Sequence, residues 1–506
     1  MRIGADHVRP ERRLHGVIAV AQASDPIGAS MINGAAPSDP GPEPVRVLRL
    51  TMRIAVTMLA NGAQTEDVES SIGQLARVFG VDGVQAAVSF SMISISRYTR
   101  HDEPPTTLLH LVRDRSTDFT RLAAVSEIVR NIHDGSLDLA AAEAEVERLD
   151  SARSSYPQRL RFVAPGLSAA GTTLLFGGDQ LEALVTLAIG LLVQPALAAL
   201  DRSSLPPFFR LGIGAAGSAI LVALLVGVGL EISGGLVLTG SLLRFLPGYA
   251  LVSGFRDLID GSVVSGTARL AEAILLAAAV AAGTALSLAL AGSVGVTLQI
   301  LTVGNVDWGL GVSVAAALVA VAAYAVQLGV PPGAVGQAAI VGTIGWSLSQ
   351  TTATRFGLLD VSVATLAATV VIGALGRILA RRRGAPAAIW VVPAVLPLLP
   401  GLQLVQAMLA ETDAARISGL AAAAGTAFVI GTGVALGDIL VKVIRGIRDR
   451  VVAPAVGKVA EGVEIMVVVP VGRAVDRARH GEVGFPAHAA AAKGPEADEE
   501  LSPPAE

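Results

Sequence analysis

The stretch RFLPGYALVSGFRDLIDGS, residues 244–262, places a Pro-Gly pair, two arginines and two aspartates in an otherwise apolar part of the chain. Proline removes a backbone hydrogen-bond donor and glycine loosens the chain, so the pair predicts a helix that is broken within its hydrophobic length. A second Pro-Gly pair occurs in PLLPGLQLVQAM, residues 397–408, 153 residues after the first. The fold must therefore accommodate the same interruption twice.

The composition is that of a membrane protein. The 506 residues are 52% hydrophobic and 16% charged, with a mean hydropathy of +0.61, whereas a soluble chain carries about 25% charged residues. Many apolar runs approach the length that a membrane-spanning helix needs. The chain has no cysteine, which excludes disulfides, thiolate metal sites and cysteine nucleophiles. A net charge of −4 without a basic domain argues against a nucleic-acid partner.

Shifts in polarity along the chain predict six parts. They are a disordered leader (1–44), a cytoplasmic α+β domain (45–160), a first five-helix membrane module (161–291), a linker (292–305), a second five-helix membrane module (306–441) and a cytoplasmic, largely disordered tail (442–506). The leader and the tail are rich in proline and small residues, and the tail ends in an acidic run, a composition typical of disorder.

In the α+β domain, we expect two helices before a pair of strands along the chain and two helices after it. Helical spacing predicts a helix from residue 45 to Gly62 and a second over 65–79 with Thr65 as its N-cap. Alternation predicts one strand over 85–99 and a hairpin partner over 106–115. Two more helices are expected near 117–134 and 138–151, with Ser136 as a cap candidate.

Ten membrane spans are expected in the apolar part. They are 161–178, 180–200, 208–230, 232–252, 267–291, 306–328, 333–354, 361–380, 386–408 and 415–441. With the N-terminus inside, the cytoplasmic ends hold most of the basic residues, among them Arg381, Arg382, Arg383 and Lys442. The opposite ends are mainly acidic, with Asp179, Glu231 and Asp360. This split follows the positive-inside rule and predicts that both termini are cytoplasmic.

The two Pro-Gly pairs fall at equivalent places, late in the fourth span and late in the ninth. Each half then has five spans, and because five is odd the second half enters the membrane from the opposite side. This is the pattern of an inverted-topology repeat, in which helices broken at corresponding positions build a substrate site. The alternative is that Pro and Gly are simply frequent in transmembrane helices; the matching positions favour the functional interpretation.

Two segments resemble a known family. LANGAQTEDVESSIGQLARVFGV (59–81), followed by a serine-rich strand, is similar to the N-terminal signature of the threonine/serine exporter family. LPGYALVSGFRDLIDGSVVSGTARLAEAILLAAAVAAG (246–283) resembles its first membrane half, and the LPLLPG region (396–401) looks like its second, shorter membrane module. The resemblance covers about 45–441. It implies an inner-membrane exporter of L-threonine and L-serine that is driven by the proton motive force.

The first candidates for the transport path are the break residues Pro247, Gly248, Pro400 and Gly401. A broken helix exposes backbone carbonyl and amide groups that can meet the charged ends of an amino acid.

Arg256 and Asp257, with Asp260, are expected in the loop after the fourth span, at the cytoplasmic mouth. Arginine can bind a carboxylate through two hydrogen bonds, and aspartate can bind an ammonium group. The alternative interpretation is an interfacial salt bridge that anchors the helix end.

Charged residues inside the spans are the candidates for proton coupling. Arg244 and Glu272 can pair between neighbouring helices, or both can reach the cytoplasmic interface. Glu272 is also a candidate proton carrier, because a poorly solvated carboxylate can titrate. Asp438 is a weaker candidate, since Lys442 lies one helical turn later and is expected to pair with it.

The sequence thus predicts a mainly α-helical, polytopic membrane protein that works as a secondary transporter and not as an enzyme, and the family resemblance implies that it lies in the prokaryotic cytoplasmic membrane. The expected partners are a small amino acid, protons and lipid; a homo-oligomer is compatible with the sequence, and no cofactor or metal is expected. Two alternatives stay open: a membrane-anchored hydrolase that uses His101, His110 or His133, and a sensor with a ligand-binding N-terminal domain. Neither a Gly-x-Ser-x-Gly elbow nor a metal-binding His pair occurs in the sequence.

Overall fold

The computed structural model describes residues 42–99, 104–113, 115–152, 155–298, 308–355, 360–410 and 412–461. Nearly all of the expected leader, part of the linker and the tail after residue 461 lie outside this range. Contacts divide the chain into one unit, Met1–Ile447, and a second, Arg448–Glu506. All contacts described below lie within the first unit.

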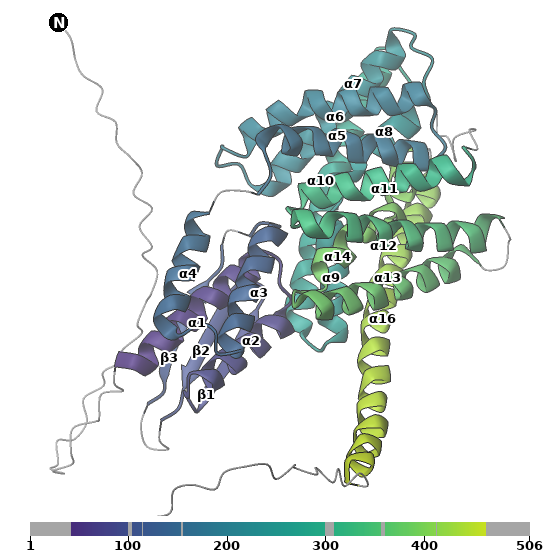
Figure 1. Ribbon diagram of the computed structural model, residues 1–506. Helices are drawn as coiled ribbons and strands as arrows, with labels where there is room; N and C mark the ends of the chain where they lie inside the picture. The colour runs from purple at the N-terminus through teal and green to yellow at the C-terminus, as the bar shows by residue number, and fades with distance from the viewer. Residues whose placement is uncertain are drawn as a thin grey trace, which may run out of the picture. The chain divides into compact units, whose positions relative to one another are not determined.

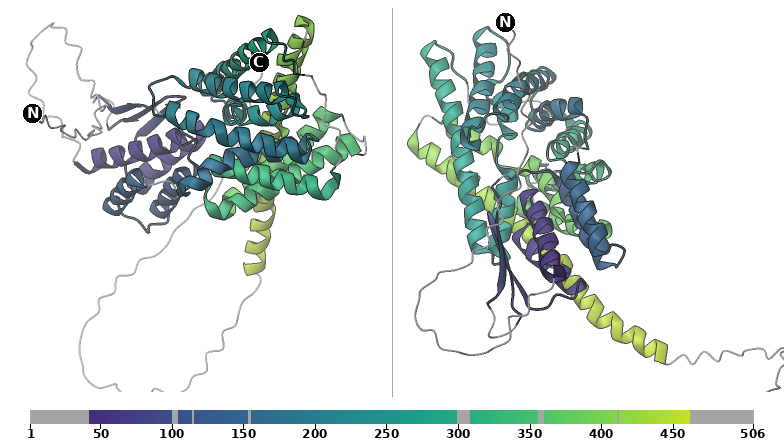
Figure 2. Two further views of the ribbon diagram at one scale, coloured as in Figure 1. Left: turned by 90° about the horizontal axis from the view of Figure 1, so that it is seen from above. Right: turned by 90° about the vertical axis from the view of Figure 1, so that its left-hand side faces the viewer.

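The N-terminal domain holds four helices and a small antiparallel sheet; the first two helices pack against the sheet, and the third and fourth pack on the first helix (Figures 1 and 2). Its elements are α1 (Pro42–Ala60), α2 (Thr65–Val78), β1 (Val84–Ser89), β2 (Met92–Arg97), β3 (Thr106–Leu111), α3 (Phe119–His133) and α4 (Leu139–Ser151). The strand order is β1-β2-β3. Ile54, Ile93, Ile95, Phe119 and Leu122 are fully buried between sheet and helices, so burial of their apolar surface stabilises the domain.

Two expectations for this domain were wrong in detail. The strand expected over 85–99 is a hairpin, in which Ser89 of β1 pairs with Met92 of β2. The apolar alternation slips by one residue at Met92 and Ile93 because the chain turns just before them, at Phe90 and Ser91. The caps also differ: α2 has Gln64 at its N-cap position, and Asp138 accepts a hydrogen bond from Ala141 N at the start of α4.

The rest of the first unit is helical. Its elements are α5 (Gln158–Leu175), α6 (Gln180–Leu200), α7 (Pro207–Gly227), α8 (Gly234–Leu243), α9 (Gly248–Ile259), α10 (Val263–Ser293), α11 (Gly309–Gln327), α12 (Pro332–Gln350), the π-helical turn η1 (Thr351–Arg355), α13 (Val361–Arg383), α14 (Ala388–Ala394), the 3-10 turn η2 (Leu396–Leu398), α15 (Gly401–Leu409) and α16 (Asp413–Glu461), of which residues up to 447 belong to this unit.

Among the described residues, six helices are long and apolar enough to cross a membrane, and the bent pair α8–α9 gives a seventh candidate. This is fewer than the ten spans expected. Of the remaining expected spans, α5 begins with Arg159 and Arg161, and α12 carries several polar residues. The ninth is divided into the short pieces α14 and α15 by the turn at Leu396–Leu398 and the second Pro-Gly pair.

Glycines allow the closest helix crossings. A Cβ atom added to Gly283 of α10 would lie 2.1 Å from the carbonyl oxygen of Gly212 on α7. On α16, a Cβ atom added to Gly437 would lie 2.1 Å from Val370 O on α13. Backbones meet at these points without side chains between them, which is the way that small residues let helices associate in membranes.

Candidate functional site

The two Pro-Gly breaks have the same local geometry. Pro247 has φ −79° and ψ 53°, and Pro400 has φ −76° and ψ 43°. Gly248 N donates to Leu246 O at 2.8 Å, and Gly401 N donates to Leu399 O at 2.8 Å. Each turn opens a new helix, and α8 and α9 are bent by 57° across the first break. The similarity of the two sequence motifs therefore extends to the backbone.

The two breaks lie against each other. A Cβ atom on Gly248 would be 2.7 Å from Leu399 Cδ1, and one on Gly401 would be 2.5 Å from Leu243 Cδ1. α8 contacts α15, while α9 contacts α14. The part before one break thus lies beside the part after the other, as expected for two broken helices that run antiparallel.

A buried cluster of charges surrounds Asp438 of α16, whose side chain is 4% exposed. Its carboxylate lies 3.1 Å from Arg256 Nη2, 3.3 Å from Arg377 Nε and 3.2 Å from Lys442 Nζ. Arg256 Nε also lies 3.5 Å from Asp260 Oδ2. The expected pairing of Asp438 with Lys442 is present, but it is one of three. Buried charges require such partners, because an unpaired one would lose its hydration without compensation.

A second buried pair lies beside this cluster. Arg269 of α10 binds Asp257 of α9 with a distance of 2.8 Å between Nε and Oδ2. Arg269 also donates to the Tyr249 hydroxyl at 2.8 Å and to Ala63 O of the N-terminal domain at 3.2 Å. Thr65 Oγ1 donates to Asp257 Oδ2 at 3.5 Å, so Thr65 contacts the helical part instead of capping its own helix.

The expected loop position of Arg256 and Asp257 is therefore wrong. Both residues lie on α9 and are buried, at 4% and 1% exposure. The charged segment continues the helix because its side chains find opposite charges on α10 and α16, so it does not need water.

The possible pair between Arg244 and Glu272 does not form. Arg244 Nη2 donates to Gln194 Oε1 of α6 at 2.6 Å. Glu272 of α10 binds Arg115 of the N-terminal domain at 2.6 Å, and the Arg115 guanidinium stacks 3.5 Å from the centre of the Phe90 ring. Glu272 thus joins the membrane part to the N-terminal domain. Its partner, Arg115, lies in the segment before α3, and the spacing of residues in the sequence does not predict this pair.

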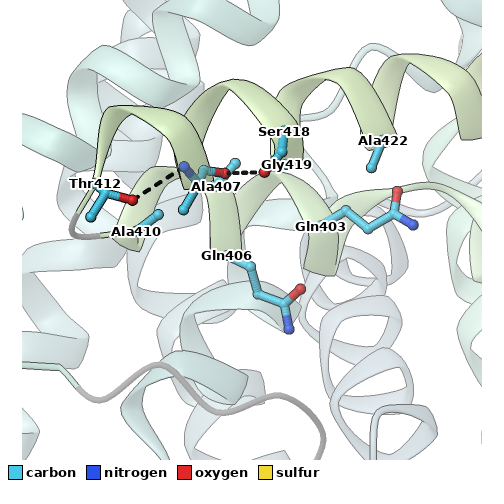
Figure 3. Close-up of a pocket in the computed structure, with 9 residues that line it drawn as sticks. Gln403, Gln406, Ala407, Ala410, Thr412, Ser418, Gly419 and Ala422 are labelled. Atoms are coloured by element: carbon cyan, nitrogen blue, oxygen red, sulfur yellow. Dashed lines mark hydrogen bonds between the residues drawn. The ribbon is translucent and has the colours of Figure 1, made fainter.

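Two hollows are lined in part by the helices that begin at the breaks, α15 and α9. The first, 590 Å³, lies between α15 and the start of α16 and is lined by Gln403, Gln406, Thr412 and small residues (Figure 3). The second, 260 Å³, is lined by α2 and α3 of the N-terminal domain and by α9 and α13, with Asp67, Arg256 and Arg377 in its wall. Neither of these two hollows is lined by the Pro-Gly residues, whose glycines are covered by leucines.

Sequence reasoning missed Arg269, Arg377, Arg115 and Asp67. The sequence held only a weak indication that these residues have buried partners. Arg269 and Arg377 were counted as positive-inside residues, although an arginine within a helical run can also indicate a buried partner.

The histidines form no catalytic constellation in the described part of the chain. His110 lies on β3 and His133 at the end of α3, while His101 lies outside the described residues. No group of three His, Asp or Glu residues able to hold a metal ion occurs within the described ranges.

These features define a class of protein: a multi-pass helical membrane protein with a small α+β domain. Residues 49–291 match the family model described as "Putative threonine/serine exporter", and residues 313–444 match the one described as "Threonine/Serine exporter, ThrE". The chain belongs to the threonine/serine exporter family.

Three relatives are similar to the chain. A protein of Mycobacterium tuberculosis named "Probable threonine/serine exporter" is 28% identical over 79% of this chain and 77% of its own length. The "Threonine/serine exporter" of Corynebacterium glutamicum is 25% identical over 43% of this chain and 46% of its own. The "Probable succinate transporter subunit YjjP" of Klebsiella aerogenes is 26% identical over 43% of this chain and 83% of its own. No solved structure matches the chain.

Proposed function

We propose that this protein exports L-threonine, L-serine or a similar small amino acid across the cytoplasmic membrane, driven by the proton motive force. The reciprocal contact between the Pro247-Gly248 and Pro400-Gly401 breaks carries this proposal. α9 and α15 both begin at this contact, and the first amides of a helix have no intrahelical acceptor. Two such helix starts form a positive region suited to a substrate carboxylate.

Helix packing supports an inverted repeat of two five-helix modules, 161–291 and 306–441. α5 packs on α6 as α11 packs on α12, and α7 contacts α8 as α13 contacts α14. The close glycine crossing of α7 with α10 has its counterpart in that of α13 with α16. α5 and α11, the first helices of the modules, pack on each other. An inverted repeat accounts for all of these pairs together.

The contacts of the N-terminal domain support ten crossings with both termini in the cytoplasm. The domain touches the end of α9 through Thr65, α10 through Arg115, the turn after α11 through Phe119 N and Leu328 O, and the end of α13 through Arg130 and Arg383 O. Ten crossings place all of these helix ends on one side. In this proposal α5, α12 and the broken pair α14–α15 also cross the membrane, and the arginines at these ends make that side cytoplasmic.

Leucines close the path in the conformation described here. Leu399 covers Gly248, and Leu243 covers Gly401. Export then requires the two modules to move relative to each other, so that the breaks open first toward one hollow and then toward the other. The buried charges around Arg256 and Asp257 hold the cytoplasmic ends of α9, α10, α13 and α16 together in this closed form.

For proton coupling, Glu272 is the proposed carrier. Protonation of Glu272 would remove its charge and release Arg115, which weakens the contact between the N-terminal domain and α10. Asp438 remains a second candidate, although its three basic partners suit a structural role. Arg244, held by Gln194, would keep α8 in place against α6.

Counterflow in proteoliposomes tests the proposal. Vesicles loaded with L-threonine should accumulate labelled L-threonine by exchange, and an imposed pH gradient should drive net flux. Absence of flux for every small amino acid tested would overturn the exporter proposal. Flux that ignores the pH gradient would overturn proton coupling alone.

A further inference from the structure

The 260 Å³ hollow joins the N-terminal domain to the helical part (hereafter the interdomain cavity). Asp67, Ser70, Ser71 and Gln74 of α2 line it. They lie at spacings i, i+3, i+4 and i+7, so they share one face of the helix. The opposite face of α2 buries Val68, Ile72 and Leu75 in the domain core. The polar face is thus directed at the membrane part of the protein.

The wall opposite α2 is basic. Arg256, Arg377 and Arg381 line the cavity together with the turn after α13. Three guanidinium groups and one carboxylate, that of Asp67, thus line the cavity. Asp438 and Asp260 compensate part of this charge, Asp438 through Arg256 Nη2 and Arg377 Nε and Asp260 through Arg256 Nε. Within the described part of the chain, nothing bonds to Nη1 or Nη2 of Arg377, so the paired donors of this group are left for another acceptor.

Asp67 has no ion-pair partner among the described residues. Its side chain is half-buried, and the Ser71 hydroxyl donates to the Asp67 backbone carbonyl at 2.7 Å. A half-buried carboxylate without a partner is costly. An external cation that enters the cavity would supply the missing partner.

We propose that the interdomain cavity binds one free zwitterionic amino acid, with its carboxylate on Arg377 and Arg256 and its ammonium group on Asp67. Arginine is the side chain best matched to a planar carboxylate, and Asp67 supplies the opposite charge at the other wall. Ser70 and Gln74, which hydrogen-bond to each other at 3.1 Å, can accept or donate to a hydroxyl-bearing side chain. The volume lies just below the ~300–1,000 Å³ of pockets for drug-sized ligands, which suits a smaller solute.

This inference rests on the proposed export of amino acids for its choice of ligand, and it gives the N-terminal domain a defined role. The domain would supply half of a cytoplasmic binding site, so that occupancy of the site links α2 to α9 and α13. A dicarboxylate such as succinate has no ammonium group and would place its second charge against Asp67. The charge pattern therefore favours a zwitterion over a dicarboxylate.

Equilibrium binding to the purified full-length protein in nanodiscs tests the ligand chemistry, with L-threonine and succinate as probes and no ion gradient. Asp67→Asn should weaken L-threonine binding at least tenfold. Glu66→Gln is the matched control, because Glu66 precedes Asp67 on the same helix turn but is exposed, and it should bind as the wild type does. Unchanged affinity in Asp67→Asn, no L-threonine binding to the wild type, or succinate binding as tight as L-threonine would each overturn the inference.

Thiol labelling tests the location, because the chain has no native cysteine. Ser70→Cys lies in the cavity wall, and Ser136→Cys is an exposed control on the same domain. L-threonine should slow the labelling of Ser70→Cys at least threefold and leave Ser136→Cys unchanged. Threonine counterflow without this protection would overturn the cavity assignment and leave the exporter proposal intact. Protection without flux of any amino acid would overturn export but retain the site.

Discussion

Gly248 and Leu399 are separated by 151 positions in the sequence, yet a single added methyl group on Gly248 would lie 2.7 Å from Leu399 Cδ1. Leu399 immediately precedes the second Pro-Gly pair, and Gly248 belongs to the first. In the reverse contact, an added methyl group on Gly401 would lie 2.5 Å from Leu243 Cδ1. The two interruptions of the helical part are therefore one structural feature built from both halves of the chain.

Enlarging Gly248 should impair transport through this contact. In Gly248→Ala the new methyl group meets Leu399, and overpacking costs about 1–3 kcal/mol, which corresponds to roughly a 5- to 150-fold slower exchange if the full cost falls on the transport step. Leu399→Ala in the same chain should restore part of the rate, because it makes room for the methyl group. The measurement is threonine counterflow at equal protein insertion. Additive losses in the double variant would show that the contact does not limit transport.

Removing the charge of Asp438 should destabilise the protein strongly. Asp438→Asn leaves three basic side chains without their shared carboxylate, and breaking a buried pair costs about 3–5 kcal/mol. The lower end applies because Arg377 and Lys442 are partly exposed. Thermal unfolding in detergent should show a clearly lower unfolding temperature than that of Asp413→Asn, whose carboxylate is 91% exposed and pairs with Arg416 at the surface. Equal unfolding temperatures for the two variants would contradict the buried network.

Glu272→Gln should separate stability from coupling. The Arg115–Glu272 pair is partly exposed, so its loss should cost less than about 1 kcal/mol of stability. Exchange should persist, while net flux driven by a pH gradient should fall, because the amide cannot carry a proton. Arg115→Gln is the companion variant: it breaks the same pair but keeps the carboxylate. Wild-type coupling in Glu272→Gln would remove Glu272 as the carrier.

Asp67 should make stability depend on pH. Burial raises the pKa of Asp67 above its usual value, against the smaller opposing effects of Arg256 and Arg377. Ionisation is thus less favourable in the folded protein than in the unfolded chain. The resulting cost is present above the raised pKa and disappears below the unfolded value of about 4. Without ligand, Asp67→Asn should be more stable than the wild type at pH 7 and should lose this advantage toward pH 4; a constant difference across this range would contradict the shift.

The ten-crossing arrangement makes a prediction for single cysteines. Gly333→Cys and Arg382→Cys should react with a membrane-impermeant reagent only from the cytoplasmic side. Ser362→Cys and Thr412→Cys should react only from the outside, since α12, α13 and the pair α14–α15 separate these four positions. Ser362→Cys on the side of Gly333→Cys would mean that α12 does not cross. Thr412→Cys on the side of Arg382→Cys would make α14–α15 a re-entrant segment.

The sequence by itself determined the features that depend on local chemistry and repetition. Apolar length, glycine content and the positions of arginine predicted a helical membrane protein, because the bilayer restricts both helix length and charge. The two Pro-Gly motifs located both helix breaks, since proline and glycine act on the backbone wherever they stand.

Only the tertiary structure decided which distant groups meet. Spacing could suggest a partner for Glu272 within the membrane part, but the partner is Arg115, which the folded N-terminal domain carries to α10. Arg256 and Asp257 read as a solvated loop because the sequence does not show that Asp438 and Arg269 lie opposite them. Charge is a property of single residues, whereas its burial depends on the partners that folding brings within a few ångströms. The contact between the two breaks and the interdomain cavity likewise depend on residues that are distant in the sequence and that folding brings together.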